Sequence, residues 1–319
     1  MASNLLRTYG VTEFLQRTTH PNYIEIISQE YSSIPGALIT GTGEKFKESR
    51  SNNENQFQTI YKEDSINTIP VDGFDLNGKF IVTEQPTEST LNSFWNMVVS
   101  TNSHVIVMLS DVEEELRPTS IPYLSSNQIN TIFKDFIVTQ KEINLEKNYT
   151  ETVLNITYTG TGHSQIVHHF KYWNWPKCGF PEEKEFLKFL LVINKKYQDF
   201  HLEEVIDSGI WAGPILVHGK AGTGRTATFC AIDTCLNQLV CKETISVQPV
   251  VVKIRDQMRN FSLPDVSQYI FIHHVLCNFL KNIRSNLEAF IQLRSFYTAR
   301  DLYLSYHPRG NYLSISLVN

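Results

Sequence analysis

Residues 214–226 read Pro-Ile-Leu-Val-His-Gly-Lys-Ala-Gly-Thr-Gly-Arg-Thr, and this stretch decides the fold. Its apolar run 215–217 predicts a buried strand, which leads into a loop that is rich in glycine. From Arg225 onward the apolar residues recur at helical spacing. A strand, a glycine loop and a helix N-terminus in this order direct successive backbone N–H groups at one point, where an anion can bind. Arg225 adds a planar guanidinium group that can hold two phosphate oxygens.

The loop resembles the His-Cys-x-x-Gly-x-x-Arg-Ser/Thr signature of the protein tyrosine phosphatases. The matching positions are His218, Ala221, Gly222, Gly224, Arg225 and Thr226. At the position of the family's nucleophilic cysteine this chain has Gly219. The resemblance therefore implies a phosphate-binding loop, residues 219–225, that has lost its nucleophile.

Further blocks resemble the family in the same order and at similar spacing, from about residue 14 to residue 283. They are Asn67–Phe74, Lys79–Pro86, Phe94–Val98, Val105–Ser110, His169–Pro181 and Gln268–Ile272. The resemblance implies an α/β fold in which a twisted mixed sheet is flanked by helices. Within the family, Phe14–Gln16 and Asn22–Glu30 are most similar to phosphatase-like proteins that bracoviruses of parasitoid wasps carry.

Length and pattern predict one large domain. The chain has 319 residues, 41% of them hydrophobic, and no tract rich in Gly, Ser or Pro. We expect a single domain over residues 1–290, with a helical segment at 1–30 packed on it, and a C-terminal tail of unassigned role at 291–319. Strands are predicted at 80–82, 105–109, 152–158, 166–170 and 215–217. Helices are predicted at 182–200, 225–241, 249–258 and 265–284.

Charge and composition limit the possible partners. A net charge of −5 argues against nucleic acid or an anionic membrane as a partner. The N-terminus lacks the apolar core of a signal peptide, and no apolar run approaches eighteen residues, so we expect a cytoplasmic protein. The five cysteines have unrelated spacings and are interpreted as reduced core thiols. No cluster has metal-ligand spacing, so no metal or other cofactor is expected.

Three positions that carry catalysis in the family are changed. Gly219 cannot attack phosphorus, because glycine has no side chain. Lys177 stands where the family's mobile Trp-Pro-Asp loop has the aspartate that protonates the leaving group. Pro264 replaces the glutamine that positions the attacking water. Loss of a nucleophile alone costs roughly 10⁶ in turnover in a well-studied hydrolase, so the resemblance predicts a protein that is not an enzyme.

The binding positions are better kept. Phe57 aligns with the tyrosine that stacks on the substrate ring, and Gln268 aligns with the second of the family's loop glutamines. Glu114 aligns with the glutamate that orients the phosphate-binding arginine. Lys220 and Lys177 would add positive charge to the pocket if both point inward. Within the loop, Thr223 is a poor nucleophile without a base, and His218 and Thr226 are expected to support the loop.

Each of these positions also has a structural interpretation, which the sequence does not exclude. The glycines can serve a tight strand-to-helix turn, and Arg225 can pair with Glu114. Gln268 lies three residues after Asp265, which fits a helix capping box. Phe57 can fill the core. Both lysines can point into solvent.

The leading hypothesis is a pseudophosphatase that binds phosphotyrosine proteins without hydrolysing them. The bracovirus resemblance implies host signalling proteins as partners and suppression of host immunity as the outcome. One alternative is a scaffold or decoy that binds a partner outside the pocket. A second alternative, an active protein tyrosine phosphatase, conflicts with the changes at Gly219, Lys177 and Pro264.

Overall fold

The computed structural model describes residues 7–34, 66–110, 130–176, 179–208, 212–219, 224–258 and 265–306. Its helices are α1 (Val11–Thr18), α2 (Tyr23–Ser32), α3 (Leu91–Ser100), α5 (Glu183–Ser208), α6 (Arg225–Lys242), α7 (Val247–Gln257), α8 (Val266–Lys281) and α9 (Leu287–Tyr306). Its strands are β1 (Tyr9–Gly10), β2 (Thr68–Gly73), β3 (Leu76–Glu84), β4 (Val105–Leu109), β5 (Asn130–Ile132), β6 (Phe136–Leu145), β7 (Tyr149–Tyr158), β8 (Ser164–Tyr172), β9 (Ile215–Gly219) and β10 (Thr244–Ile245).

The large sheet has the strand order β2-β3-β9-β4-β8-β7-β6-β5, and β1 and β10 form a separate short ribbon. The central strands β3, β9, β4 and β8 are mutually parallel, whereas β2 and β5 to β7 run antiparallel to their neighbours. The C-terminal ends of the parallel strands therefore meet along one edge, where α/β proteins bind their ligands. This arrangement confirms the predicted α/β class with a mixed sheet flanked by helices.

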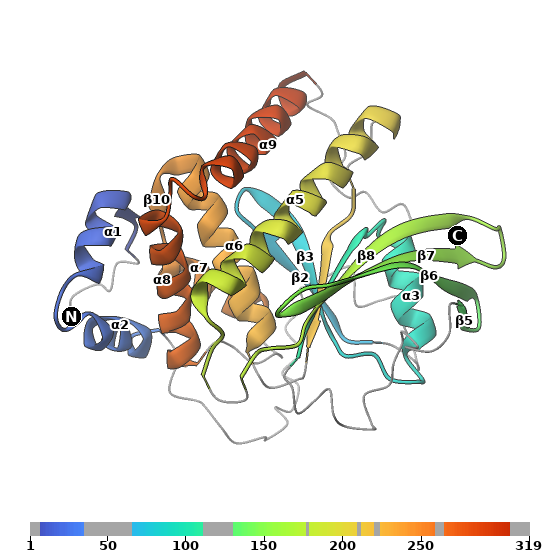
Figure 1. Cartoon of the computed structure of the whole chain (residues 1–319), viewed down its shortest axis with the longest axis horizontal. Coiled ribbons are helices and arrows are strands. Elements are labelled where there is room, and N and C mark those ends of the chain that lie inside the picture. The colour runs from blue at the N-terminus through green and yellow to red at the C-terminus, as the bar shows by residue number, and fades with distance from the viewer. Residues whose placement is uncertain are drawn as a thin grey trace, which may run out of the picture.

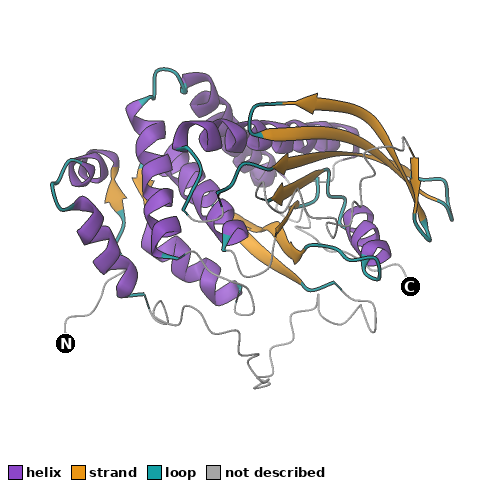
Figure 2. Cartoon of the chain, turned by 60° about the horizontal axis from the view of Figure 1, so that its bottom comes forward, coloured by secondary structure: helices purple, strands orange, loops and turns teal. Residues whose placement is uncertain are grey.

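Helices cover the two faces of the sheet unequally (Figure 1). Helices α5 to α8 pack on one face, and α3 packs on the other, as Figure 2 shows from a second direction. In β9, Ile215 and Val217 belong to the larger core, and Leu216 belongs to the smaller core beneath α3. A strand that is buried on both faces has a continuous apolar sequence rather than an alternating one. For this reason the sequence predicts β9.

The carboxylate of Glu30 links the N-terminal helices α1 and α2 to α8. Glu30 of α2 accepts a hydrogen bond from the Tyr269 hydroxyl at 2.5 Å and forms an ion pair with Arg17 of α1 at 3.0 Å. Phe14 of α1 stacks on His273 of α8 with ring centroids 5.7 Å apart. Helices α1 and α2 thus pack on α8, and residues 1–6 of the expected N-terminal segment lie outside the described residues.

The C-terminal helix α9 extends across the expected domain boundary at residue 290. Phe296 and Tyr297 are buried against α5 and α6, so the helix is part of the main core. The buried Arg300 guanidinium donates a hydrogen bond to the Asp75 carbonyl in the β2–β3 turn at 2.8 Å. The chain after residue 290 therefore continues as a packed helix to Tyr306, and residues 307–319 lie outside the described residues.

Across the described ranges, none of the helices combines the length and the apolar character that a bilayer crossing requires.

Candidate anion-binding site

The site is built where β9 ends and α6 begins. His218 and Gly219 are the last residues of β9, and both are buried. Gly219 lies in register with Leu109 of β4 on one side and with Glu84 of β3 on the other. Gly224 then has φ 67° at the position just before α6, a left-handed conformation that costs glycine little. The predicted strand, loop and helix therefore place the N-terminus of α6 at the ligand-binding edge of the sheet.

Gly219 is enclosed by the backbone of the neighbouring strand. A Cβ atom added there would lie 2.8 Å from the carbonyl oxygen of Leu109. That separation is too short for carbon and oxygen, and a strand backbone in the middle of a sheet cannot easily move away. The absence of a side chain at residue 219 is therefore built into the packing of β4 against β9.

Replacing Gly219 with alanine is expected to lower the free energy of unfolding by about 1–3 kcal/mol, the usual cost of overpacking a core. Urea unfolding followed by circular dichroism measures this change. Gly10→Ala is the matched control, because a Cβ atom at Gly10 would meet nothing within 4 Å. Equal stabilities for the two variants would contradict the close contact with Leu109.

Arg225 is the first residue of α6, and its side chain is buried with only 3% of its surface exposed. Its guanidinium carbon lies 5.9 Å from the centre of the Trp175 ring, within the range of a cation–π contact. Trp175 is itself buried and packs edge-on against Phe186 and Phe271. The arginine is thus held at the helix N-terminus by a rigid aromatic cluster.

His218 is neutral, and its side chain is buried in the core. Burial lowers the pKa of His218 to about 3. Its ring meets the Phe94 ring of α3 edge-on, with centroids 5.9 Å apart. His218 therefore adds no positive charge to the site, and its expected support of the loop stays a prediction. Thr226, the other expected support residue, is half-buried in the first turn of α6.

The charges around the site have both signs. The N-terminus of α6 and the guanidinium of Arg225 favour an anion. Glu84 ends β3 beside Gly219, and its carboxylate accepts a hydrogen bond from the Asn67 amide at 3.1 Å. A negative charge at this strand end opposes an anion, whereas Arg225 and the helix N-terminus favour one.

Gln268 takes part in a capping box at the start of α8. The Asp265 carboxylate accepts a hydrogen bond from the Gln268 backbone N–H at 2.8 Å. In return, the Gln268 side-chain oxygen accepts one from the Asp265 backbone N–H at 3.2 Å. The structural interpretation of Gln268 is therefore the one observed, and its contact with phosphotyrosine stays a prediction.

The structure brings together His218, Gly219, Gly224, Arg225 and, half-buried beside them, Thr226. Other predicted site residues lie outside the described residues: Phe57, Glu114, Lys177, Lys220, Ala221, Gly222, Thr223 and Pro264. Trp175 was not predicted to contact the site. Its position just before Pro176 in the Trp-Pro motif was the available signal, but the sequence did not indicate that its ring reaches Arg225.

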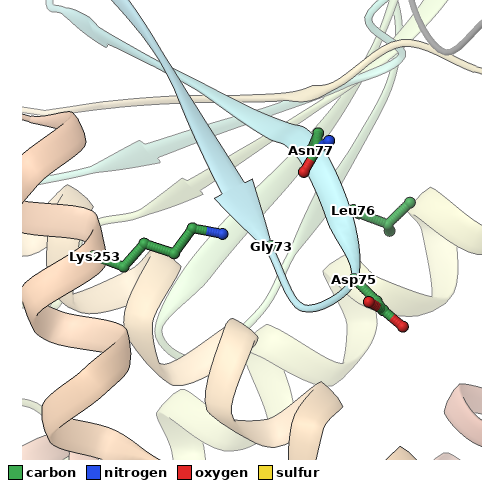
Figure 3. A pocket seen from close by; sticks show the side chains of 5 residues that line it. All are labelled: Gly73, Asp75, Leu76, Asn77 and Lys253. Atoms are coloured by element: carbon green, nitrogen blue, oxygen red, sulfur yellow. The ribbon is translucent and has the colours of Figure 1, made fainter. Parts of the chain in front are cut away.

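A separate hollow of about 350 Å³ lies at the opposite end of the sheet, beside the β2–β3 turn. Figure 3 shows its lining residues, Gly73, Asp75, Leu76, Asn77 and Lys253. Lys253 is paired with Asp72 at 2.9 Å, and the Asp75 carboxylate lies 3.6 Å from Arg300. Because these charged groups are already paired, the hollow offers no unpaired charge among them for a ligand to bind.

Within the described residues, no group of three His, Cys, Asp or Glu side chains could hold a metal ion.

Comparison with known proteins confirms the resemblance found in the sequence. The model of the family described as protein-tyrosine phosphatase matches residues 50–278. Tyrosine phosphatase H3 of Microplitis demolitor bracovirus (isolate Webb) is 29% identical over 91% of this chain and 98% of the relative. Tyrosine phosphatase-like protein J1 of the same virus is 27% identical over 88% of this chain and 98% of the relative. Receptor-type tyrosine-protein phosphatase C of Mus musculus is 33% identical over 67% of this chain and 16% of the mouse protein.

Proposed function

Because the chain belongs to the protein-tyrosine phosphatase family, we propose that it is a member that binds phosphotyrosine proteins without hydrolysing them. One observation carries the proposal. Arg225 is buried at the N-terminus of α6 against Trp175, beside a strand that ends in a residue without a side chain. This arrangement supports a site that keeps an arginine for phosphate and has glycine in place of the nucleophile.

The loss of catalysis rests on three positions that the resemblance assigns to chemistry. Gly219 stands for the nucleophile, Lys177 for the general acid and Pro264 for the glutamine that positions water. The packing at Gly219 supports the same conclusion, since the Leu109 carbonyl oxygen would lie 2.8 Å from the Cβ atom of any side chain there. A cysteine could not be restored at this position without moving β4 or β9.

The retention of binding rests on the geometry of the described part of the loop. Gly224 adopts the left-handed conformation that leads into α6, and the N-terminus of a helix favours an anion. A phosphate dianion is also freed from the repulsion that a cysteine thiolate beneath it would exert. Together these features favour capture of a phosphate group over its removal.

The relatives suggest the setting. The names of the bracovirus proteins describe a tyrosine phosphatase in one case and a tyrosine phosphatase-like protein in another. We propose that this chain is a viral modulator of host signalling. Its partner is a phosphotyrosine-containing signalling protein of the host, and it acts in the host cytoplasm to suppress immune responses.

Titration of phosphotyrosine peptides against the purified protein and its Arg225→Ala variant tests the binding function. We expect dissociation constants on the order of micromolar. The variant should bind about 10- to 100-fold more weakly, because a charge-assisted bidentate contact is lost. Binding should weaken with added salt, and the released phosphate in a parallel assay should stay at background.

Arg294→Ala is the matched control, because Arg294 is an exposed arginine of α9 that pairs with Glu243 at 3.5 Å. It should bind like the unaltered protein. Phosphopeptide binding that survives Arg225→Ala would contradict the proposed site. Absence of binding altogether would favour the scaffold or decoy alternative, and steady phosphate release would show an active enzyme.

A further inference from the structure

Asn148, in the turn between β6 and β7, connects this turn to the segment that follows β8. Its side-chain oxygen accepts a hydrogen bond from the Asn174 amide at 2.8 Å. Its backbone oxygen accepts one from the Trp173 N–H at 3.2 Å. Its own amide donates to the Glu185 carboxylate of α5 at 3.3 Å. Although it lies in a hairpin turn, Asn148 is only 6% exposed, so it is a buried junction of three elements.

The segment that Asn148 holds leads directly to the anion site. Trp175 follows Asn174, and its backbone N–H donates to the Ser110 carbonyl at the end of β4, at 3.3 Å. The Trp175 ring then lies against the guanidinium of Arg225. The path from the turn to the phosphate-binding arginine therefore runs through residues that are adjacent in sequence or in contact.

We infer that Asn148 is a positioning residue for the anion site, acting through Asn174 and Trp175 on Arg225. Asn148 lies on the hairpin, far along the chain from the phosphate loop, and its hydrogen bonds link it to Trp173, Asn174 and Glu185. Its effect is on geometry, because a buried guanidinium binds phosphate well only in the orientation that its neighbours impose. The effect on ligand affinity rests on the proposed function, whereas the effect on the 173–176 segment does not.

The contacts of Asn148 also show whether this residue can carry a glycan in the folded protein. Asn148-Tyr-Thr matches the acceptor motif for N-linked glycosylation. A glycan requires an exposed amide nitrogen, but here that nitrogen is bonded to Glu185 and the residue is buried. In the folded protein this asparagine is a structural group and not a glycan acceptor.

Hydrogen exchange of the Asn148→Ala variant, read by mass spectrometry on peptides spanning residues 173–176, tests the inference without any ligand. The variant should exchange the Trp173 and Trp175 amides on the order of tenfold faster, because it loses the side-chain hydrogen bond from Asn174 and the one to Glu185 that anchors the turn to α5. Asn174→Ala removes the shorter of these bonds from the other side and should produce a similar acceleration. Phosphotyrosine-peptide affinity should fall in parallel by on the order of threefold to tenfold.

Asn155→Ala is the matched control, since Asn155 lies in β7 and its side chain bonds to Thr157 at 3.3 Å. It should leave exchange at 173–176 unchanged. Unchanged exchange there in both Asn148→Ala and Asn174→Ala would overturn the inference. Faster exchange with unaltered phosphopeptide affinity would also overturn it, as it would show a purely structural role. If the unaltered protein binds no phosphopeptide, the proposed function fails, and accelerated exchange still establishes that Asn148 positions the segment.

Discussion

Replacing Lys79 with alanine is expected to lower the free energy of unfolding by about 3–5 kcal/mol, the usual cost of breaking a buried ion pair. The Lys79 ammonium group of β3 lies 2.6 Å from the Asp233 carboxylate of α6, and both side chains are almost completely buried. Removing the lysine leaves the carboxylate buried without its counter-charge. Urea unfolding of the variant, followed by circular dichroism, measures the loss.

The pair belongs to a larger buried polar group, which raises the cost of disturbing it. Asn194 of α5 donates to the other Asp233 oxygen at 2.6 Å and accepts from Lys79 at 3.2 Å. Asn237 donates to the Asp233 backbone carbonyl at 2.8 Å. Gly73 leaves room for the lysine stem, because an added Cβ atom would lie 2.6 Å from the Lys79 Cδ atom. The group therefore fixes how β3, α5 and α6 pack.

Two further variants separate charge from packing. The double variant Lys79→Met with Asp233→Leu removes both charges, and it should be much less destabilised than Lys79→Ala, since no unpaired charge is left. Lys195→Ala breaks an exposed pair with Asp199 at 2.8 Å and should change stability by less than about 0.5 kcal/mol. If Lys79→Ala behaves like Lys195→Ala, the buried pair contributes no more than a surface pair.

The sequence predicted the parts of the fold whose pattern is local. Strands β4 and β9 are buried on both faces, so their apolar runs were recognised. The sequence pattern does not predict strand β2, which contains Pro70; proline is compatible with a strand at the edge of a sheet but not in its centre. Helix α9 was not assigned either, because it lies beyond the last block that resembles the family.

The site was predictable to the extent that it is contiguous in the chain. Gly219, Gly224 and Arg225 come from one strand-loop-helix unit, so the sequence places them together. The contact of Trp175 with Arg225 and the pairing of Lys79 with Asp233 join segments that are distant in sequence. Such contacts depend on the packing of whole elements, which a single sequence does not reveal. For the same reason, the sequence could not distinguish whether Gln268 caps a helix or binds a ligand.

Lowering the pH from 7.5 to 5.0 is expected to reduce the free energy of unfolding by about 6 kcal/mol through His201, His218 and His273. Burial also lowers the pKa of His169 well below its usual value, which adds to the decline. Burial lowers the pKa of His201, His218 and His273 to about 3 in each case. In the unfolded chain a histidine has a pKa of about 6.5 and binds a proton as the pH falls. The folded state does not, so each histidine disfavours folding by about 2 kcal/mol at pH 5.0.

The sign and the pH window follow from the lowered pKa values. Well above pH 6.5 both states are neutral at these residues and stability is constant. As the pH falls through about 6.5 stability declines, until the folded histidines begin to titrate near pH 3. Carboxylates such as Asp72, whose pKa is lowered mainly by hydrogen bonds from the Gly78 backbone and Lys253 against the effect of burial, lose their contribution only at more acidic pH. The change between pH 7.5 and 5.0 is therefore specific to histidine.

The nearby charges do not reverse this expectation. Glu30 lies 3.8 Å from His273, but it already forms an ion pair with Arg17 and accepts a hydrogen bond from the Tyr269 hydroxyl. Its negative charge is therefore compensated. His201 bonds to the Tyr197 carbonyl at 3.2 Å and meets the Phe296 ring edge-on, which makes His201→Phe a conservative way to remove one titrating group. Urea unfolding at a series of pH values should show a decline about 2 kcal/mol smaller in that variant, the contribution of one histidine. Stability that stays flat from pH 7.5 to 5.0 would mean that these histidines become protonated within the folded core.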